Sequence, residues 1–139
     1  MTTKLNFKQS FNAGLKAAGT ATLINAILFY IFHGAGIIVD TIFIQPDQPM
    51  TIVPIIISSI VPTLIATFVF FLLEKFTKNG FKIFRIIALI LLVLSFINPF
   101  MGIQGVTIGY AIALNIMHIV VVAALLYFIG KNLKKNLGN

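Results

Sequence analysis

The stretch IVPIIISSIVPTLIATFVFFLL, residues 52–73, decides the fold of this chain. It contains no charged residue, and about 20 mostly apolar residues are enough for a helix to cross a membrane. A small soluble domain cannot hide such a run together with others like it, because it leaves much of its surface exposed after folding. The stretch therefore predicts a membrane-spanning helix.

The rest of the composition extends this prediction to the whole chain. Of its 139 residues, 59% are hydrophobic and only 9% are charged, whereas soluble domains are about 25% charged. There is no cysteine, which excludes disulfides and thiolate chemistry. We therefore predict one integral membrane domain over residues 1–139, an all-α bundle of four transmembrane helices. The expected spans are residues 17–39, 52–73, 81–97 and 106–129.

The basic residues test the number of spans independently. All ten Lys and Arg residues precede the first span, lie between the second and third or just inside the third, or follow the fourth. Four spans place these segments on one side, whereas three or five would scatter them. The positive-inside rule then predicts both termini in the cytoplasm. Topology also explains the pI near 10 better than nucleic-acid binding does.

The same charges indicate partners and location. We expect contact with anionic lipids at the cytoplasmic face and no nucleic-acid partner. Nine of the ten basic residues are Lys, and Ile and Asn are frequent, which suggests an AT-rich bacterial genome. The expected location is therefore the bacterial cytoplasmic (inner) membrane, which the protein crosses several times.

Two segments outside the spans each allow two structures. Residues 1–16 place apolar residues on one helical face, which favours a short helix lying at the membrane interface. The alternative is a simple extension of the first span. In the loop 40–51, Pro46 and Pro49 limit strand pairing, so an irregular loop is favoured over a small hairpin.

Small residues at spacing four predict where helices approach one another closely. In the fourth span these are Gly105, Gly109 and Ala113, and they also permit a homo-oligomer. The first span has Gly14, Ala18, Thr22 and Ala26, and the second has Ser59, Thr63 and Thr67. Pro62 frees the carbonyl of Ser58 and predicts a kink in the second span.

Polar residues inside the spans are candidates for a polar core or a ligand site, because such residues face the bundle interior or a cavity. A rise of about 1.5 Å per residue sorts them by depth. His118 lies roughly 16 Å from the cytoplasmic end, near the midplane, and Asn25 lies somewhat lower. The middle layer holds Ser58, Ser59, Ser95, Asn115 and His118. The outer layer holds His33, Asn98 and Tyr110.

His118 has three interpretations. The first is an interhelical hydrogen bond, the second a ligand-binding or proton-handling role, and the third a metal or haem ligand. His33 and His118 differ in depth by about 8 Å, which fits one bis-histidine haem within a single chain poorly. The acids Asp40, Asp47 and Glu74 lie only at the membrane edges, and Glu74 beside Lys75 reads as an ordinary helix-end charge pair. We therefore expect no metal site and no cofactor.

These observations favour a non-enzymatic membrane component that binds a lipid, a small apolar ligand or a partner protein. No nucleophile–base set, paired carboxylates or phosphate loop indicates an enzyme. The alternative is a small channel or passive transporter with a polar path around His118 and Asn115. A redox protein or enzyme using His33 and His118 is a third hypothesis.

The second half of the chain resembles a known family. The stretches are EKFTKNGFKIFRIIALILLVLSFINPF and ALNIMHIVVVAALLYFIGKNL. The motifs are Leu-Glu-Lys-Phe at residues 73–76 and the pair Met117 and His118. They resemble a family of small uncharacterised bacterial four-helix membrane proteins over residues 60–130. The resemblance implies four spans in a bacterial inner membrane and no particular activity.

Overall fold

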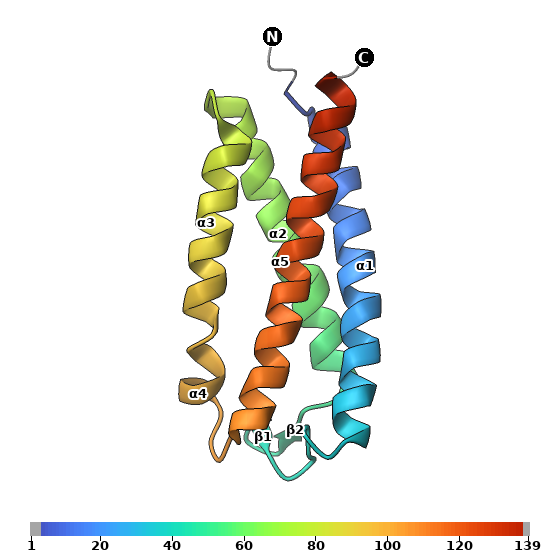
Figure 1. Cartoon of the computed structure of the whole chain (residues 1–139), viewed down its shortest axis with the longest axis vertical. Helices are drawn as coiled ribbons and strands as arrows, with labels where there is room; N and C mark the ends of the chain where they lie inside the picture. The colour runs from blue at the N-terminus through green and yellow to red at the C-terminus, as the bar shows by residue number, and fades with distance from the viewer. Residues whose placement is uncertain (1–3, 138–139) are drawn as a thin grey trace.

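The computed structural model describes residues 4–137 and consists of antiparallel helices in an up-down bundle (Figure 1). Four helices are long and apolar enough to cross a membrane, which confirms the predicted number of helices able to span one, although a two-stranded hairpin joins the first two. Their large apolar side chains are widely exposed on the outside of the bundle, as expected where lipid replaces water. The elements are α1 (Phe7–Gly34), β1 (Phe43–Gln45), β2 (Gln48–Pro49), α2 (Ile52–Phe76), α3 (Gly80–Ser95), α4 (Asn98–Gly102) and α5 (Ile108–Leu137).

Helix α1 begins earlier than the sequence predicts. Asn6 and Gln9 form a capping box, in which Gln9 N–H donates to Asn6 Oδ1 at 2.9 Å and Asn6 N–H donates to Gln9 Oε1 at 3.0 Å. The helix then continues without a break to Gly34. A separate interfacial helix over residues 1–16 is therefore wrong for residues 7–16, which extend the first span, and residues 1–3 lie outside the described part.

The loop between α1 and α2 contains a β-hairpin. The sequence analysis favoured an irregular loop here, and that prediction is wrong. Strands β1 and β2 pair antiparallel, with Gln45 opposite Gln48. Pro46 and Asp47 form the turn, and Asp47 has φ of 60°. Proline presets the first turn position, and Asp tolerates a positive φ at the second. The two prolines therefore sit at the turn and the edge of the hairpin, where they do not prevent it.

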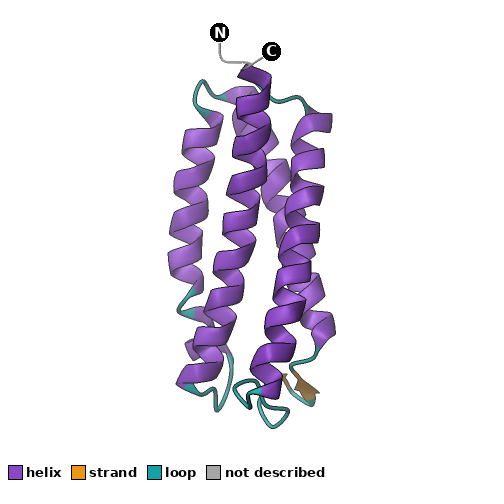
Figure 2. Cartoon of the chain, turned by 45° about the vertical axis from the view of Figure 1, so that its right-hand side comes forward, coloured by secondary structure: helices purple, strands orange, loops and turns teal. Residues whose placement is uncertain are grey.

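The third span is interrupted near its end. Helix α3 ends at Ser95 and a short helix, α4, occupies residues expected to be loop. Figure 2 shows this short helix and the hairpin at the same end of the bundle. We call this end the hairpin half, and the opposite end, where α1 starts and α5 finishes, the terminal half.

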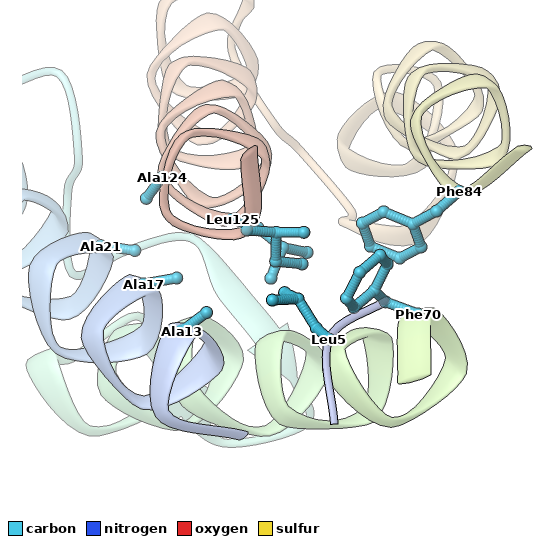
Figure 3. Close-up of a cluster of buried hydrophobic side chains, with 9 residues drawn as sticks. Leu5, Ala13, Ala17, Ala21, Phe70, Phe84, Ala124 and Leu125 are labelled. Carbon is cyan, nitrogen blue, oxygen red and sulfur yellow. The ribbon is translucent and has the colours of Figure 1, made fainter. Parts of the chain in front are cut away.

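The core divides into two clusters along the bundle. In the terminal half, Phe70 of α2 and Phe84 of α3 meet edge to face at 5.4 Å between ring centroids. Small side chains of α1 face α5 beside them (Figure 3). The second cluster lies in the hairpin half and joins α1, α2 and α5 to the loops. Its buried members are Phe29, Ile38, Ile42, Met50, Ile55, Tyr110, Ala113, Leu114 and Met117.

The predicted small-residue seams are confirmed only where α1 meets α2. Gly14 packs so closely on Thr67 that any added Cβ would overlap the threonine side chain. Ser59, Thr63 and Thr67 are all buried. Thr63 and Thr67 each donate their hydroxyl to the carbonyl four residues earlier, at 2.6 and 2.7 Å. Satisfied hydroxyls of this kind let two helices approach without leaving polar groups unpaired in the membrane.

The seam predicted on the fourth span is wrong in part. Gly105 precedes α5 and has φ of 72°, so it belongs to the turn and not to a helix face. Gly109 is exposed, and a Cβ there would make only an ordinary contact with Ile37 at 3.6 Å. Ala113 alone is buried. The spacing of four residues predicted a common helix face, but α5 starts at Ile108, so Gly105 lies outside the helix.

Candidate functional site

A cavity of about 310 Å³ lies in the hairpin half of the bundle. Its walls come from α1, α2 and α5, with α4 and the loop around the hairpin contributing the remainder. The volume is at the lower end of the range for small-molecule sites. The lining residues are Asn25, Ile44, Met50, Pro54, Ile55, Ser58, Ser59, Asn98, Pro99, Gly102, Ile103, Leu114, Met117, His118 and Val121.

Five of the predicted polar residues meet at this cavity. They are Asn25, Ser58, Ser59, Asn98 and His118. No Asp, Glu, Lys or Arg is among the lining residues. The His118 imidazole is the one lining side chain that can take up a charge. The remaining walls are apolar, the composition that small-molecule pockets share.

Asn25 links three helices beside the cavity. It is 2% exposed. Its amide Nδ2 donates to Ser59 Oγ on α2 at 3.0 Å and to the Met117 carbonyl on α5 at 3.2 Å. Its Oδ1 is buried and has no hydrogen-bond partner in the described chain. Turning the amide over would set Oδ1 against the Met117 carbonyl oxygen, so the bonds fix its orientation.

His118 follows Met117 on α5 and therefore sits at the level of Asn25. It is partly buried and lines the cavity. Its Nδ1 is buried and finds no hydrogen-bond partner among residues 4–137. The first interpretation of His118, a satisfied interhelical hydrogen bond, is therefore wrong for this nitrogen.

The other four predicted polar residues lie elsewhere. Asn115 donates Nδ2 to the Phe96 carbonyl at 3.3 Å, tying α5 to the end of α3. Ser95 donates its hydroxyl to the Leu92 carbonyl of its own helix at 2.6 Å. Tyr110 is fully buried in the hairpin-half cluster. The predicted pairing of Asn115 with His118 as one site therefore does not hold.

His33 pairs with an acid and not with His118. Its Nε2 lies 3.1 Å from Asp40 Oδ1, on the exposed surface of the hairpin half. The two histidines do not share a site. No group of three or more His, Asp or Glu residues able to hold a metal occurs within residues 4–137.

Pro62 lies within α2 on an exposed face, where its ring cannot donate to the Ser58 carbonyl. The Ser58 hydroxyl donates to the Ile55 carbonyl at 3.1 Å, which gives the side chain a partner within its own helix. The amount of bending at Pro62 stays a prediction.

The terminal half gathers the charges and closes the bundle. The three basic segments meet there because the helices alternate in direction (Figure 1). Lys4 donates Nζ to the carbonyls of Lys75 and Thr77, at 3.3 and 3.0 Å, and so caps the end of α2. Glu74 is only 7% exposed and packs against Gly80 at the start of α3. Within the described chain it forms no ion pair with Lys75, so the expected helix-end pair is wrong.

Sequence reasoning missed the apolar half of the cavity. Met50, Leu114 and Met117 line it from a loop and from α5, and Pro99, Gly102 and Ile103 line it from α4 and the residue that follows. In a chain this apolar, such residues carry no signal of their own. The pair Asn98 and Pro99 could have revealed α4, because proline favours the first turn of a helix.

The fold and the site together define a small helical membrane protein with a cavity near one end. The chain belongs to the DUF6069 family, a family of unknown function whose model matches residues 7–135. No curated protein and no solved structure matches it. The family match confirms the resemblance noted over residues 60–130 and extends it to nearly the whole chain.

Proposed function

We propose that this protein is a non-enzymatic binding protein of the bacterial cytoplasmic membrane that holds a small, largely apolar molecule in the cavity of its hairpin half. The observation that carries the proposal is the meeting of three polar residues from three helices, Asn25, Ser59 and His118, on an otherwise mostly apolar wall. Pockets with this composition use apolar surface for affinity and a few polar groups for orientation. The ligand would come from the bilayer.

Binding is favoured over catalysis because His118 has no acid or base beside it in the cavity. General acid–base catalysis by histidine needs a reacting group and usually a second residue that orients the ring. The lining offers hydroxyl and amide groups only. These groups can hold and orient a molecule without reacting with it.

The passive channel has less support. A path across the bundle would have to continue through the terminal half, where Phe70, Phe84 and Ile129 are buried in one apolar cluster. The cavity lining reaches no further in that direction than Asn25 and Val121. A pocket confined to one half of the bundle fits binding better than conduction.

The basic end supports an orientation and one class of partner. All ten Lys and Arg residues lie toward the terminal half, which we place in the cytoplasm with both termini. There they would attract anionic lipid headgroups, each lysine near the surface contributing about 1 kcal/mol. The cavity would then lie in the outer half of the membrane. Homo-oligomer formation is compatible with this arrangement.

A native mass spectrum of the protein released from lipid nanodiscs tests the proposal. We expect wild type to retain a defined extra mass. Ser58→Phe adds a large ring at the cavity wall, from a position whose only side-chain hydrogen bond within residues 4–137 is local, and it should lose that mass. Ile57→Phe is the matched control, because Ile57 is exposed and does not line the cavity. Equal retained mass in both variants would overturn the proposal, as would wild type that binds nothing.

A further inference from the structure

We infer that the ligand of the cavity is an uncharged apolar molecule carrying a hydroxyl group, which Asn25, Ser59 and His118 recognise. This inference rests on the proposed binding function and names the chemical class of the ligand. It follows from the charge of the lining and from which hydrogen-bonding groups the protein leaves unused.

The charge of the lining disfavours ions. Moving a carboxylate or an ammonium group into an apolar site costs several kcal/mol or more unless an opposite charge meets it. None of the lining residues is Lys, Arg, Asp or Glu. Organic amines in their charged form therefore meet no opposite charge in this cavity, and a fatty-acid carboxylate could meet one only in a protonated His118.

The unused hydrogen-bonding groups include one fixed acceptor. Asn25 donates its N–H groups to Ser59 Oγ and the Met117 carbonyl, and its Oδ1 has no partner in the described chain. A carboxamide oxygen can only accept. A ligand whose polar group only accepts, such as a ketone or an ester, would leave this oxygen as it is in the free protein. A ligand that donates would gain one further hydrogen bond, and the site therefore favours a donor.

The cavity also offers groups that can donate. Ser59 Oγ accepts from Asn25, and no bond from its own hydroxyl hydrogen occurs within residues 4–137. The buried Nδ1 of His118 donates or accepts according to the tautomer. An alcohol hydroxyl both donates and accepts, so it matches this set where an alkane, a ketone or an ion does not.

The rest of the wall suits an apolar body of adaptable shape. Ile55, Leu114 and Val121 line it with aliphatic side chains, and Met50 and Met117 add flexible thioethers. Methionine side chains fill irregular space and tolerate different partners. The polar group would lie between α1, α2 and α5, and the body would run toward α4 and the hairpin.

Five probes on one carbon skeleton test the inference. They are decanol, decane, methyl octyl ketone, decanoate and decylamine. Each is titrated at pH 7 into lipid nanodiscs holding wild type or Ser58→Phe, so that partition into lipid is subtracted. We expect decanol to bind wild type about tenfold or more tightly than each other probe, since one well-made hydrogen bond is worth about a factor of ten.

The outcomes separate the two proposals. If no probe binds wild type better than Ser58→Phe, the binding function itself fails. If probes bind but decane, the ketone or either ion equals decanol, the binding function stands and the hydroxyl class is overturned. Only preferred binding of decanol supports both.

Variants assign the selectivity to residues. His118→Leu and Ser59→Ala should each reduce the preference for decanol over decane several-fold, because each removes a group that can bond the hydroxyl. Asn115→Leu removes a comparable interhelical bond outside the cavity and should leave the preference intact. A preference that survives both cavity variants would overturn the assignment.

Discussion

The terminal half and the hairpin half are built from the same apolar helices, but the first is closely packed and the second contains a cavity. In the terminal half, Gly14 lies directly on Thr67, and Gly80 lies on Glu74, so neither glycine leaves room for a side chain. In the hairpin half, polar groups of three helices surround a cavity, and two of its lining residues, Asn25 and His118, each have a buried atom without a partner in the described chain. Close packing supplies stability. The unpaired groups beside this cavity are the ones for which a ligand would supply a partner.

The difference has a source in the side chains of α1. Toward the terminal half its buried positions are Ser10, Ala13, Gly14, Ala17, Ala18 and Ala21, whose small size allows close approach. Further along, Asn25 and Phe29 take these positions. Larger side chains of α1 therefore face its neighbours at the level of the cavity, which Asn25 lines. Four predictions test this contrast, in order of decreasing effect.

The largest effect is expected from Gly14→Ala. The new Cβ would overlap the side chain of Thr67, including its Cβ, so the helices must separate. We expect the free energy of unfolding to fall by about 2–3 kcal/mol. Gly19→Ala is the matched control, since nothing lies within 4 Å of its added Cβ. It should stabilise slightly, because alanine is the better helix former. Thermal unfolding in detergent would measure both, and equal midpoints would contradict a tight seam.

The second effect concerns Gly80→Ala at the start of α3. Its Cβ would meet backbone atoms of Glu74, which cannot rotate away, so the turn between α2 and α3 must open. We expect a loss of about 1–2 kcal/mol in the free energy of unfolding. Gly102→Ala in the hairpin half is the comparison, because its nearest neighbour is Asn98 Oδ1 at 3.4 Å. Should Gly102→Ala destabilise as much as Gly80→Ala, the two halves would not differ in tightness.

Several features of both halves could be predicted from the sequence. Four spans and the gathering of the charges followed from hydropathy and the positions of Lys and Arg, because lipid imposes both patterns directly. The seam of Ser59, Thr63 and Thr67 followed from helical spacing. Depth along the helices put Ser58, Ser59 and His118 in one layer, and all three line the cavity. Asn25, placed somewhat lower, and Asn98, placed in the outer layer, line the same cavity.

The direction in which a side chain faces around its helix was harder to predict from the sequence than its depth in the membrane. Asn115 and His118 share a level and a spacing of three, yet Asn115 reaches α3 while His118 lines the cavity. That outcome depends on where α3 ends and α4 begins, which hydropathy does not report. The burial of Glu74 likewise depends on the path of the turn that brings Gly80 against it.

The third effect separates stability from binding. Asn25→Leu removes two hydrogen bonds between helices, and Asn115→Leu removes one. Interhelical bonds in membrane proteins contribute about 0.6 kcal/mol each on average, so both variants should lose about 1 kcal/mol or less. Only Asn25→Leu should also weaken decanol binding, because only Asn25 lines the cavity. Unchanged binding in Asn25→Leu would show that the polar group of the ligand is held elsewhere.

The smallest effect is expected at the surface of the hairpin half, where His33 and Asp40 pair 3.1 Å apart. Their side chains are 42% and 73% exposed, so water screens the attraction. Exposed pairs contribute about 0–1 kcal/mol, and we expect Asp40→Asn to change the free energy of unfolding by less than about 0.5 kcal/mol. Thermal unfolding beside Asp47→Asn, an acid of the same hairpin half without such a pair in the described chain, measures the difference. A loss above about 1 kcal/mol in Asp40→Asn alone would mean that this pair fixes the loop over the cavity, and that the hairpin half has an anchor of its own.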